Sequence, residues 1–103
     1  DKEQFERFKH RFNVLNSKEY KRRFSMLASL LDEHFHTLGC EVGDDYETVR
    51  ASYLNLTKVY HPDRHATKSD KIQKDYTDKF QKIGLAYEAL KPYFKEQKNY
   101  INS

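Results

Sequence analysis

The sequence Val59-Tyr60-His61-Pro62-Asp63-Arg64 interrupts a helical pattern near the middle of the chain. Proline has no backbone N–H and disfavours the α conformation in the residue before it, so a helix that includes Leu56 and Tyr60 should end at about His61. Another helix-compatible run begins after a charged gap. His61-Pro62-Asp63 is therefore predicted to form an exposed corner between two helices.

The helices on either side of this corner are predicted to cover residues 46–60 and 71–91, the second one ending at Pro92. Each carries apolar residues at intervals of three or four, which is typical of an amphipathic helix. The first stripe consists of Val49, Tyr53, Leu56 and Tyr60, and the second of Ile72, Tyr76, Phe80, Ile83, Tyr87 and Leu90. A connection of about ten residues favours an antiparallel hairpin. Its predicted core includes Tyr53, Leu56, Phe80, Ile83 and Tyr87.

The segments that flank the hairpin are also predicted to be helical. Residues 2–13 form a short amphipathic helix whose Phe5/Phe8/Phe12 stripe should pack against the rest of the chain or, as the alternative, enter the groove of a partner. From a Ser17 N-cap, one helix should run through residues 18–38 to a stop at Gly39, because the stripe contains no Gly or Pro. The later N-caps are Asp44 or Asp45, and Ser69 or Asp70. Residues 93–103 should form a short helix that frays.

Composition agrees with one all-α domain and an appendage. The 103 residues are 34% charged and 37% hydrophobic, the aromatic residues are eight Tyr and seven Phe, and the net charge is +3. The only cysteine, Cys40, excludes an internal disulfide and favours a reducing compartment, so we expect a cytoplasmic location. A membrane span needs about 18 consecutive apolar residues, and we expect none. Because the chain begins with Asp1 rather than Met, we expect it to be a module of a larger protein.

The corner and its surroundings resemble the J-domain (DnaJ-type) family, the co-chaperones of the 70-kDa heat-shock chaperones. The resemblance rests on Ala51-Ser52-Tyr53 before the corner, on Ala86-Tyr87-Glu88-Ala89-Leu90 after it, and on Phe35-His36-Thr37-Leu38-Gly39, which is similar to the family's opening helix. It implies a J-domain over residues 32–94, with an N-terminal helical extension over 1–31 and a C-terminal tail over 95–103. The implied fold is an antiparallel helical hairpin with short flanking helices.

The same resemblance implies that the chain binds a DnaK-type chaperone in its ATP state and stimulates ATP hydrolysis, without being an enzyme itself. The corner residues His61, Pro62 and Asp63 would trigger hydrolysis. Partner-binding residues near them would be Arg50, Leu54 and Lys58 on the helix before the corner and Arg64 just after it. Leu54 and Asn55 stand where basic residues are common in the family.

Other functions are weaker interpretations of the same residues. The cluster Lys18, Lys21, Arg22 and Arg23 is compatible with nucleic-acid binding through the phosphate backbone, although a solvated helix face is the simpler interpretation. The histidines and the cysteine (His34, His36, Cys40, His61 and His65) lie on different elements, so we expect neither a metal site nor a cofactor. No nucleophile–base pair or phosphate-binding loop is evident. A structural scaffold remains the other alternative.

Overall fold

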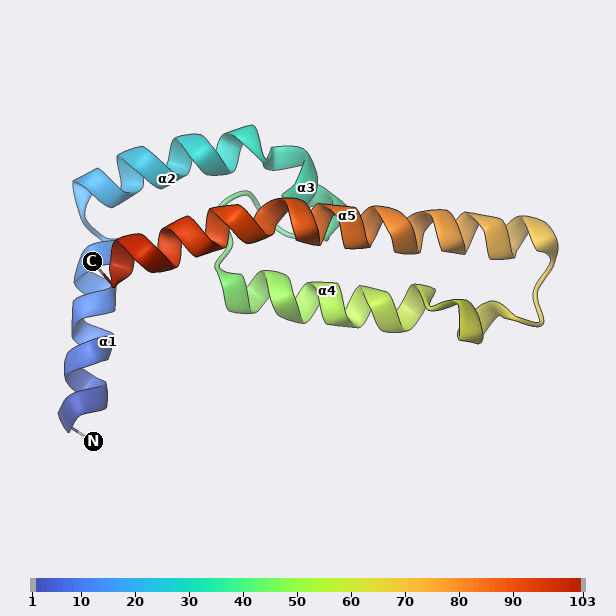
Figure 1. Cartoon of the computed structure of the whole chain (residues 1–103), viewed down its shortest axis with the longest axis horizontal. Coiled ribbons are helices and arrows are strands. Elements are labelled where there is room, and N and C mark those ends of the chain that lie inside the picture. The colour runs from blue at the N-terminus through green and yellow to red at the C-terminus, as the bar shows by residue number, and fades with distance from the viewer. Residues whose placement is uncertain (1, 103) are drawn as a thin grey trace.

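The structure, a computed structural model, describes residues 2–102, which form an elongated all-α domain (Figure 1). The elements are α1 (Lys2–Leu15), α2 (Lys18–Leu30), α3 (Asp32–Thr37), α4 (Tyr46–Tyr60), the 3₁₀ helix η1 (Pro62–His65) and α5 (Asp70–Ile101). The radius of gyration is 17.2 Å, whereas a compact chain of this length has a radius of about 13 Å. The predicted all-α class is confirmed.

Helices α4 and α5 form the predicted antiparallel hairpin, with η1 at its closed end (Figure 1). Val49 and Ile83 are buried between them. Tyr53 stacks on Tyr87 with 4.0 Å between the ring centroids. Of the predicted core residues, only Ile83 is fully buried, while the others are partly buried. The hairpin is therefore a thin two-helix layer with one face in solvent.

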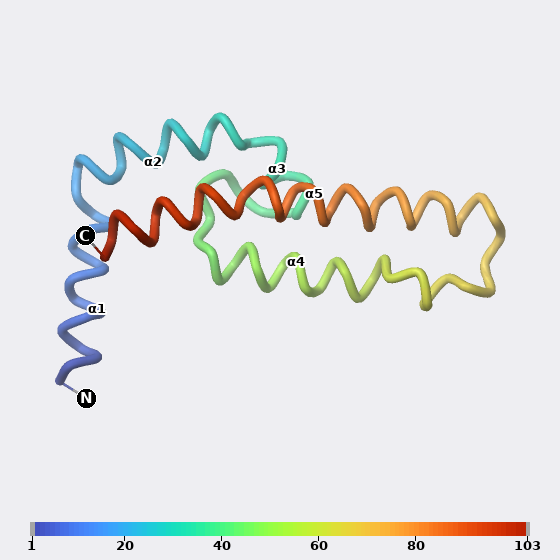
Figure 2. The backbone as a smooth tube through the Cα atoms, in the orientation of Figure 1, coloured from blue at the N-terminus to red at the C-terminus, as the bar shows by residue number. Residues whose placement is uncertain are grey.

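Helix α5 does not end before Pro92, and the prediction of a separate, fraying helix after it is wrong. The helix continues to Ile101, the last turns burying Tyr93 and Phe94; Ser103 lies outside the described residues. A proline inside a helix costs about 3 kcal/mol, but burial of two aromatic side chains contributes roughly 1.5–3 kcal/mol each. The C-terminal part of α5 is inclined to the rest in Figure 2, as expected when proline interrupts the hydrogen-bond ladder.

The predicted single helix over residues 18–38 is also wrong, because the chain turns at Leu31. Leu31 has φ −107° and ψ 15°, and its N–H bonds back to the carbonyl of Ala28. Helix α2 starts from the predicted Ser17 cap and lies along the C-terminal half of α5, whereas α3 changes direction and packs against α5 (Figure 1). The turn lets Phe24 and Phe35 both become buried, which a straight helix could not achieve against a bent α5.

A cluster of aromatic rings fills the space where α2 and α3 meet α5. The rings of Phe24 and Phe35 each contact the ring of Tyr93 in a T-shaped arrangement. The centroid distance is 6.0 Å for Phe24 and 5.8 Å for Phe35. The side-chain amide of Gln97 donates a hydrogen bond to the hydroxyl of Tyr20, and burial raises the pKa of Tyr93 to about 12. This cluster holds α2 and α3 against the C-terminal half of α5.

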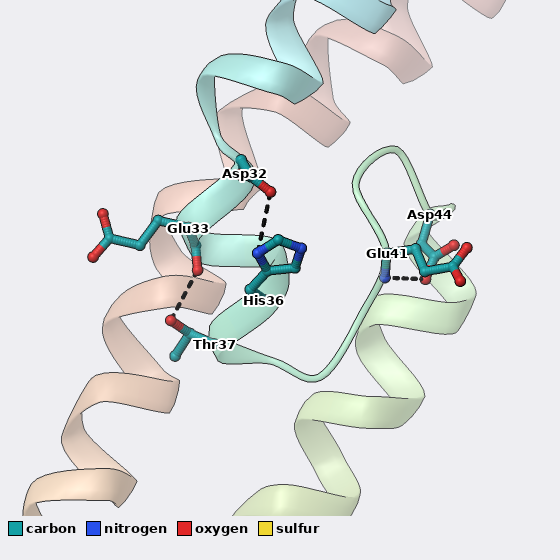
Figure 3. A network of polar contacts seen from close by, with 6 residues as sticks. All are labelled: Asp32, Glu33, His36, Thr37, Glu41 and Asp44. Atoms are coloured by element: carbon teal, nitrogen blue, oxygen red, sulfur yellow. Dashed lines mark hydrogen bonds and ion pairs between the residues drawn. The ribbon is translucent and has the colours of Figure 1, made fainter.

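The connection from α3 to α4 is held by short polar contacts (Figure 3). His36 pairs with Asp32 at 3.2 Å, and the hydroxyl of Thr37 donates to the carbonyl of Glu33. The predicted choice between two caps is resolved, since Asp45 caps α4 by accepting from the N–H of Thr48, and Asp44 accepts from the N–H of Glu41. Gly39 and Gly43 have the positive φ values that this tight connection requires. The hydroxyl of Ser52 in α4 donates to the carbonyl of Leu38 at the end of α3, and this bond joins the two helices.

Helix α1 projects from the junction between α2 and the end of α5 (Figures 1 and 2). Its side chains Phe5, Phe8 and Phe12 are 60%, 66% and 58% exposed. The preferred prediction that these rings pack against the rest of the chain is therefore wrong. A contact of 3.0 Å between the Nε2 atom of His10 and the carbonyl oxygen of Ile101 joins α1 to the end of α5.

Candidate functional site

The corner has the conformation that the sequence predicts. Helix α4 ends at Tyr60, and His61 is extended with φ −60° and ψ 133°, as proline requires of the residue before it. Pro62 is then the first residue of η1, where its missing N–H leaves no hydrogen bond unmade. His61, Pro62, Asp63 and Arg64 are all exposed. The corner is thus a rigid, solvent-facing tip at the end of the hairpin opposite the aromatic cluster.

The side chain of His61 is held by the backbone of Asp63. The backbone N–H of Asp63 donates to Nδ1 of His61 at 3.2 Å, so Nδ1 is unprotonated when this bond forms and the proton lies on Nε2. The carboxylate of Asp63 lies 3.7 Å from the same ring and its side chain is 93% exposed. The tip therefore offers a partner one N–H donor on a ring held by the backbone of Asp63, and one exposed carboxylate acceptor beside it.

Residues that follow the corner in η1 and α5 support it through ring and hydrogen-bond contacts. His65 contacts the carbonyl oxygen of Val59 through Nε2 at 2.8 Å, and its ring lies against Tyr76 with centroids 3.9 Å apart. The ring of His61 meets the ring of Phe80 edge to face at 5.7 Å. These contacts connect the end of α4, η1 and α5; they include the ring of His61 but not the side chain of Asp63.

The remaining predicted partner-binding residues lie on one exposed face of α4. Arg50, Leu54 and Lys58 follow one another at intervals of four, so they share a face that leads toward His61. All three are exposed, Leu54 at 40%. Arg64 follows the corner in η1, and its N–H donates to the carbonyl of His61. The structure thus brings the seven predicted residues into one surface that runs along α4 and around the tip.

Comparison with known proteins identifies the family. The model of the DnaJ domain matches residues 33–100, about two thirds of the chain. The chain belongs to the DnaJ-domain family. The match begins within α3 and ends within α5, so it includes the corner and the whole hairpin of this J-domain but neither α1 nor α2.

Several relatives share the J-domain. The chain is 36% identical over 58 residues to a chaperone protein DnaJ of Mesomycoplasma hyopneumoniae, a match that covers 56% of the chain and 16% of the relative. It is 35% identical over 66 residues to the DnaJ homolog dnj-10 of Caenorhabditis elegans, covering 64% and 13%. It is 25% identical over 99 residues to the DnaJ homolog subfamily C member 7 of Mus musculus, covering 87% and 20%. The chain therefore spans at most about a fifth of these relatives. No solved structure matches it significantly.

The residues that hold the J-domain corner from below were missed as functional residues. The sequence predicts His65 as a surface or corner histidine without a metal, and Tyr76 and Phe80 as members of an apolar stripe. The signal was present, since Tyr76 and Phe80 are four residues apart and lie on the face of α5 that meets the corner. The position of His65 below the corner follows from the path of η1, which the sequence did not reveal.

The residues considered for other sites are dispersed. Within residues 2–102 no three His, Cys, Asp or Glu side chains are placed to share a metal ion, and no helix is long and apolar enough to span a membrane. Cys40 is buried, which raises the pKa of its thiol. Lys18, Lys21, Arg22 and Arg23 are exposed on α2, where Arg23 pairs with Glu96 of α5 at 3.3 Å.

Proposed function

We propose that this J-domain binds a 70-kDa heat-shock chaperone of the DnaK type in its ATP state and stimulates ATP hydrolysis. The observation that carries the proposal is the exposed His61-Pro62-Asp63 tip, which lies within the family match and presents an N–H donor and a carboxylate acceptor to solvent. The chemistry belongs to the partner, and the module itself is not an enzyme. The buried, single Cys40 supports a reducing compartment such as the cytoplasm.

The tip acts by binding one state of the chaperone better than another. A ligand shifts an equilibrium only through different affinities for its states. The carboxylate of Asp63 is suited to a charge-assisted bond with an arginine of the partner, and Nε2 of His61 to an acceptor beside it. Arg50, Lys58 and Arg64 attract an acidic surface, and Leu54 adds an apolar contact between them.

The test measures steady-state ATP hydrolysis by a DnaK-type chaperone with increasing amounts of the chain. We expect His61→Gln and Asp63→Asn to abolish stimulation. A matched control is Asp78→Asn, which removes an equivalent charge from an exposed position on α5 and should leave stimulation intact. Equal stimulation by the wild type and Asp63→Asn would refute the proposed role of the tip.

The helix α4 face has its own test. Arg50→Ala and Lys58→Ala should weaken binding moderately, and more at low salt, because salt screens exposed charges. Leu54→Lys should speed association if the partner surface is acidic. Stopped-flow association rates at two ionic strengths measure both effects, and rates that do not change with salt would exclude steering by this face.

A further inference from the structure

A concave space lies at the other end of the hairpin, where α1, the start of α4 and the C-terminal half of α5 meet. It has a volume of about 600 Å³ and is open to solvent. We call it the notch. Arg11 contributes from α1, and Tyr46 and Glu47 from α4. The other lining residues come from α5 and its C-cap: Tyr87, Lys91, Phe94, Lys95, Gln97, Lys98, Ile101 and Asn102. Fifteen residues of rise along α5 correspond to about 22 Å, so the notch is elongated along that helix.

The notch has an apolar floor. Tyr46 and Phe94 meet edge to face with centroids 5.5 Å apart, and Ile101 extends this surface toward the end of α5. The hydroxyl of Tyr87 donates to that of Tyr46 at 3.5 Å. Burial and the neighbouring Tyr46 raise the pKa of Tyr87 to about 12, so its phenol adds no negative charge at neutral pH.

The sides of the notch are cationic. Lys91, Lys95 and Lys98 line it at intervals of four and three residues, which places them on one face of α5, and Arg11 lies across from them. Lys91 is paired with Glu88 at 2.8 Å. Within residues 2–102, Arg11, Lys95 and Lys98 make no ion pair with a carboxylate. Glu47 is the acidic residue that lines the notch.

We propose that the notch binds an acidic amphipathic helix of a partner protein. An apolar floor between cationic sides fits a helix that carries apolar residues on one face and carboxylates on its flanks. The spacing of Lys91, Lys95 and Lys98 matches acidic residues at i, i+3 and i+7 of an antiparallel helix, and a helix of about 15 residues has the length of the notch. This inference does not depend on the proposed function, because none of these residues belongs to the tip.

The shape favours a peptide over a nucleic acid or a lipid surface. The site is bounded on three sides by α1, α4 and α5, so a flat bilayer cannot reach its floor, and Glu47 opposes a continuous row of phosphates. Nucleic acid and anionic membranes are therefore alternatives for the experiment to exclude.

The experiment uses fluorescence anisotropy with the whole chain and a labelled model peptide of about 15 residues, with Leu and Phe on one face and Glu beside them. We expect the peptide to bind, and the Lys95→Glu/Lys98→Glu variant to bind it at least about tenfold more weakly, since two attractions become repulsions. The same variant should gain affinity for a twin peptide with Lys in place of Glu. Arg11→Glu should also weaken binding, because Arg11 forms the opposite side.

Matched controls separate this site from general charge effects. Lys71→Glu/Lys74→Glu reverses two exposed charges near the other end of α5, and Arg7→Glu reverses one on α1, where Arg7 pairs with Glu3. Neither should change the affinity by more than about twofold. Circular dichroism verifies that each variant is folded.

Three outcomes overturn the proposal. The first is no binding of the Glu peptide to the wild-type chain at millimolar concentration. The second is equal weakening by the notch and control variants. The third is that the notch variant loses affinity for an oligothymidylate or for phosphatidylserine vesicles but not for the peptide, which would assign the notch to nucleic acid or to a membrane surface.

Discussion

The two ends of α5 differ in how deeply the side chains around them are buried. At the end near α2 and α3, Phe24, Phe35 and Leu90 are at most 2% exposed and are surrounded by other aromatic rings. At the other end, Asp63 is 93% exposed, and the corner is held by the edges of a few rings. One long helix therefore joins a buried region that stabilises the domain to an exposed tip that contributes little to its stability. Substitutions at the two ends should therefore have opposite effects on stability and on function.

The largest expected effect is from Phe35→Ala. Its side chain is fully buried against Tyr93 and Phe94, so truncation should destabilise the domain by about 3–5 kcal/mol. Urea unfolding followed by circular dichroism measures the change. The matched variant at the tip is Phe80→Ala, where the ring is only partly buried, and we expect about half that loss or less. Equal losses would contradict the difference between the two ends.

The second largest effect is expected from Pro92→Ala, which should stabilise the domain. Pro92 is exposed inside α5, so Pro92→Ala restores one hydrogen bond and relieves a steric conflict in the turn before it. The gain should be about 1–3 kcal/mol, visible as a higher Tm. A loss of stability would mean that the inclination of the C-terminal part of α5 is needed for α2 to pack.

The outcomes at Pro92 and Leu31 show which parts of the fold the sequence reveals. The apolar periodicity predicted α4, the corner and the antiparallel hairpin, because these depend on local rules. Two helix boundaries were wrong because packing overrides such rules: Tyr93 and Phe94 hold the helix together beyond a proline, and the break at Leu31 buries both Phe24 and Phe35 without any Gly or Pro. The tip residues came from the motif, whereas the role of His65 below them required the path of η1.

A smaller effect is expected at the cap of α4. Hydrogen bonds from Thr48 hold the pKa of Asp45 below its usual value. A lowered pKa contributes stability above the unfolded-state value, near 4, and this contribution is lost as the pH falls through the folded-state value. Asp45→Ala should cost about 1 kcal/mol at pH 7 and less in acid. Unfolding curves at pH 7 and pH 3 measure this, and an unchanged difference would exclude the carboxylate as the cause.

The smallest expected change in stability is at the tip. Asp63→Asn alters an exposed side chain. The bond between Asp63 and His61 uses the backbone N–H of Asp63, which the substitution leaves in place. Exposed substitutions of this kind change the free energy of unfolding by no more than about 0.5 kcal/mol. Urea unfolding measures it, with Asp78→Asn as the exposed control on α5. A loss of several kcal/mol would mean that the tip supports the fold.

Single-turnover ATP hydrolysis by a DnaK-type chaperone shows most directly whether the exposed tip carries the function. It is measured with the wild-type chain, Asp63→Asn and Pro92→Ala, each at a temperature where unfolding curves show it to be folded. We predict that the wild type and Pro92→Ala accelerate hydrolysis equally despite their different stabilities, and that folded Asp63→Asn does not accelerate it. Acceleration that follows stability, or that persists in Asp63→Asn, would contradict the assignment of function to the exposed tip.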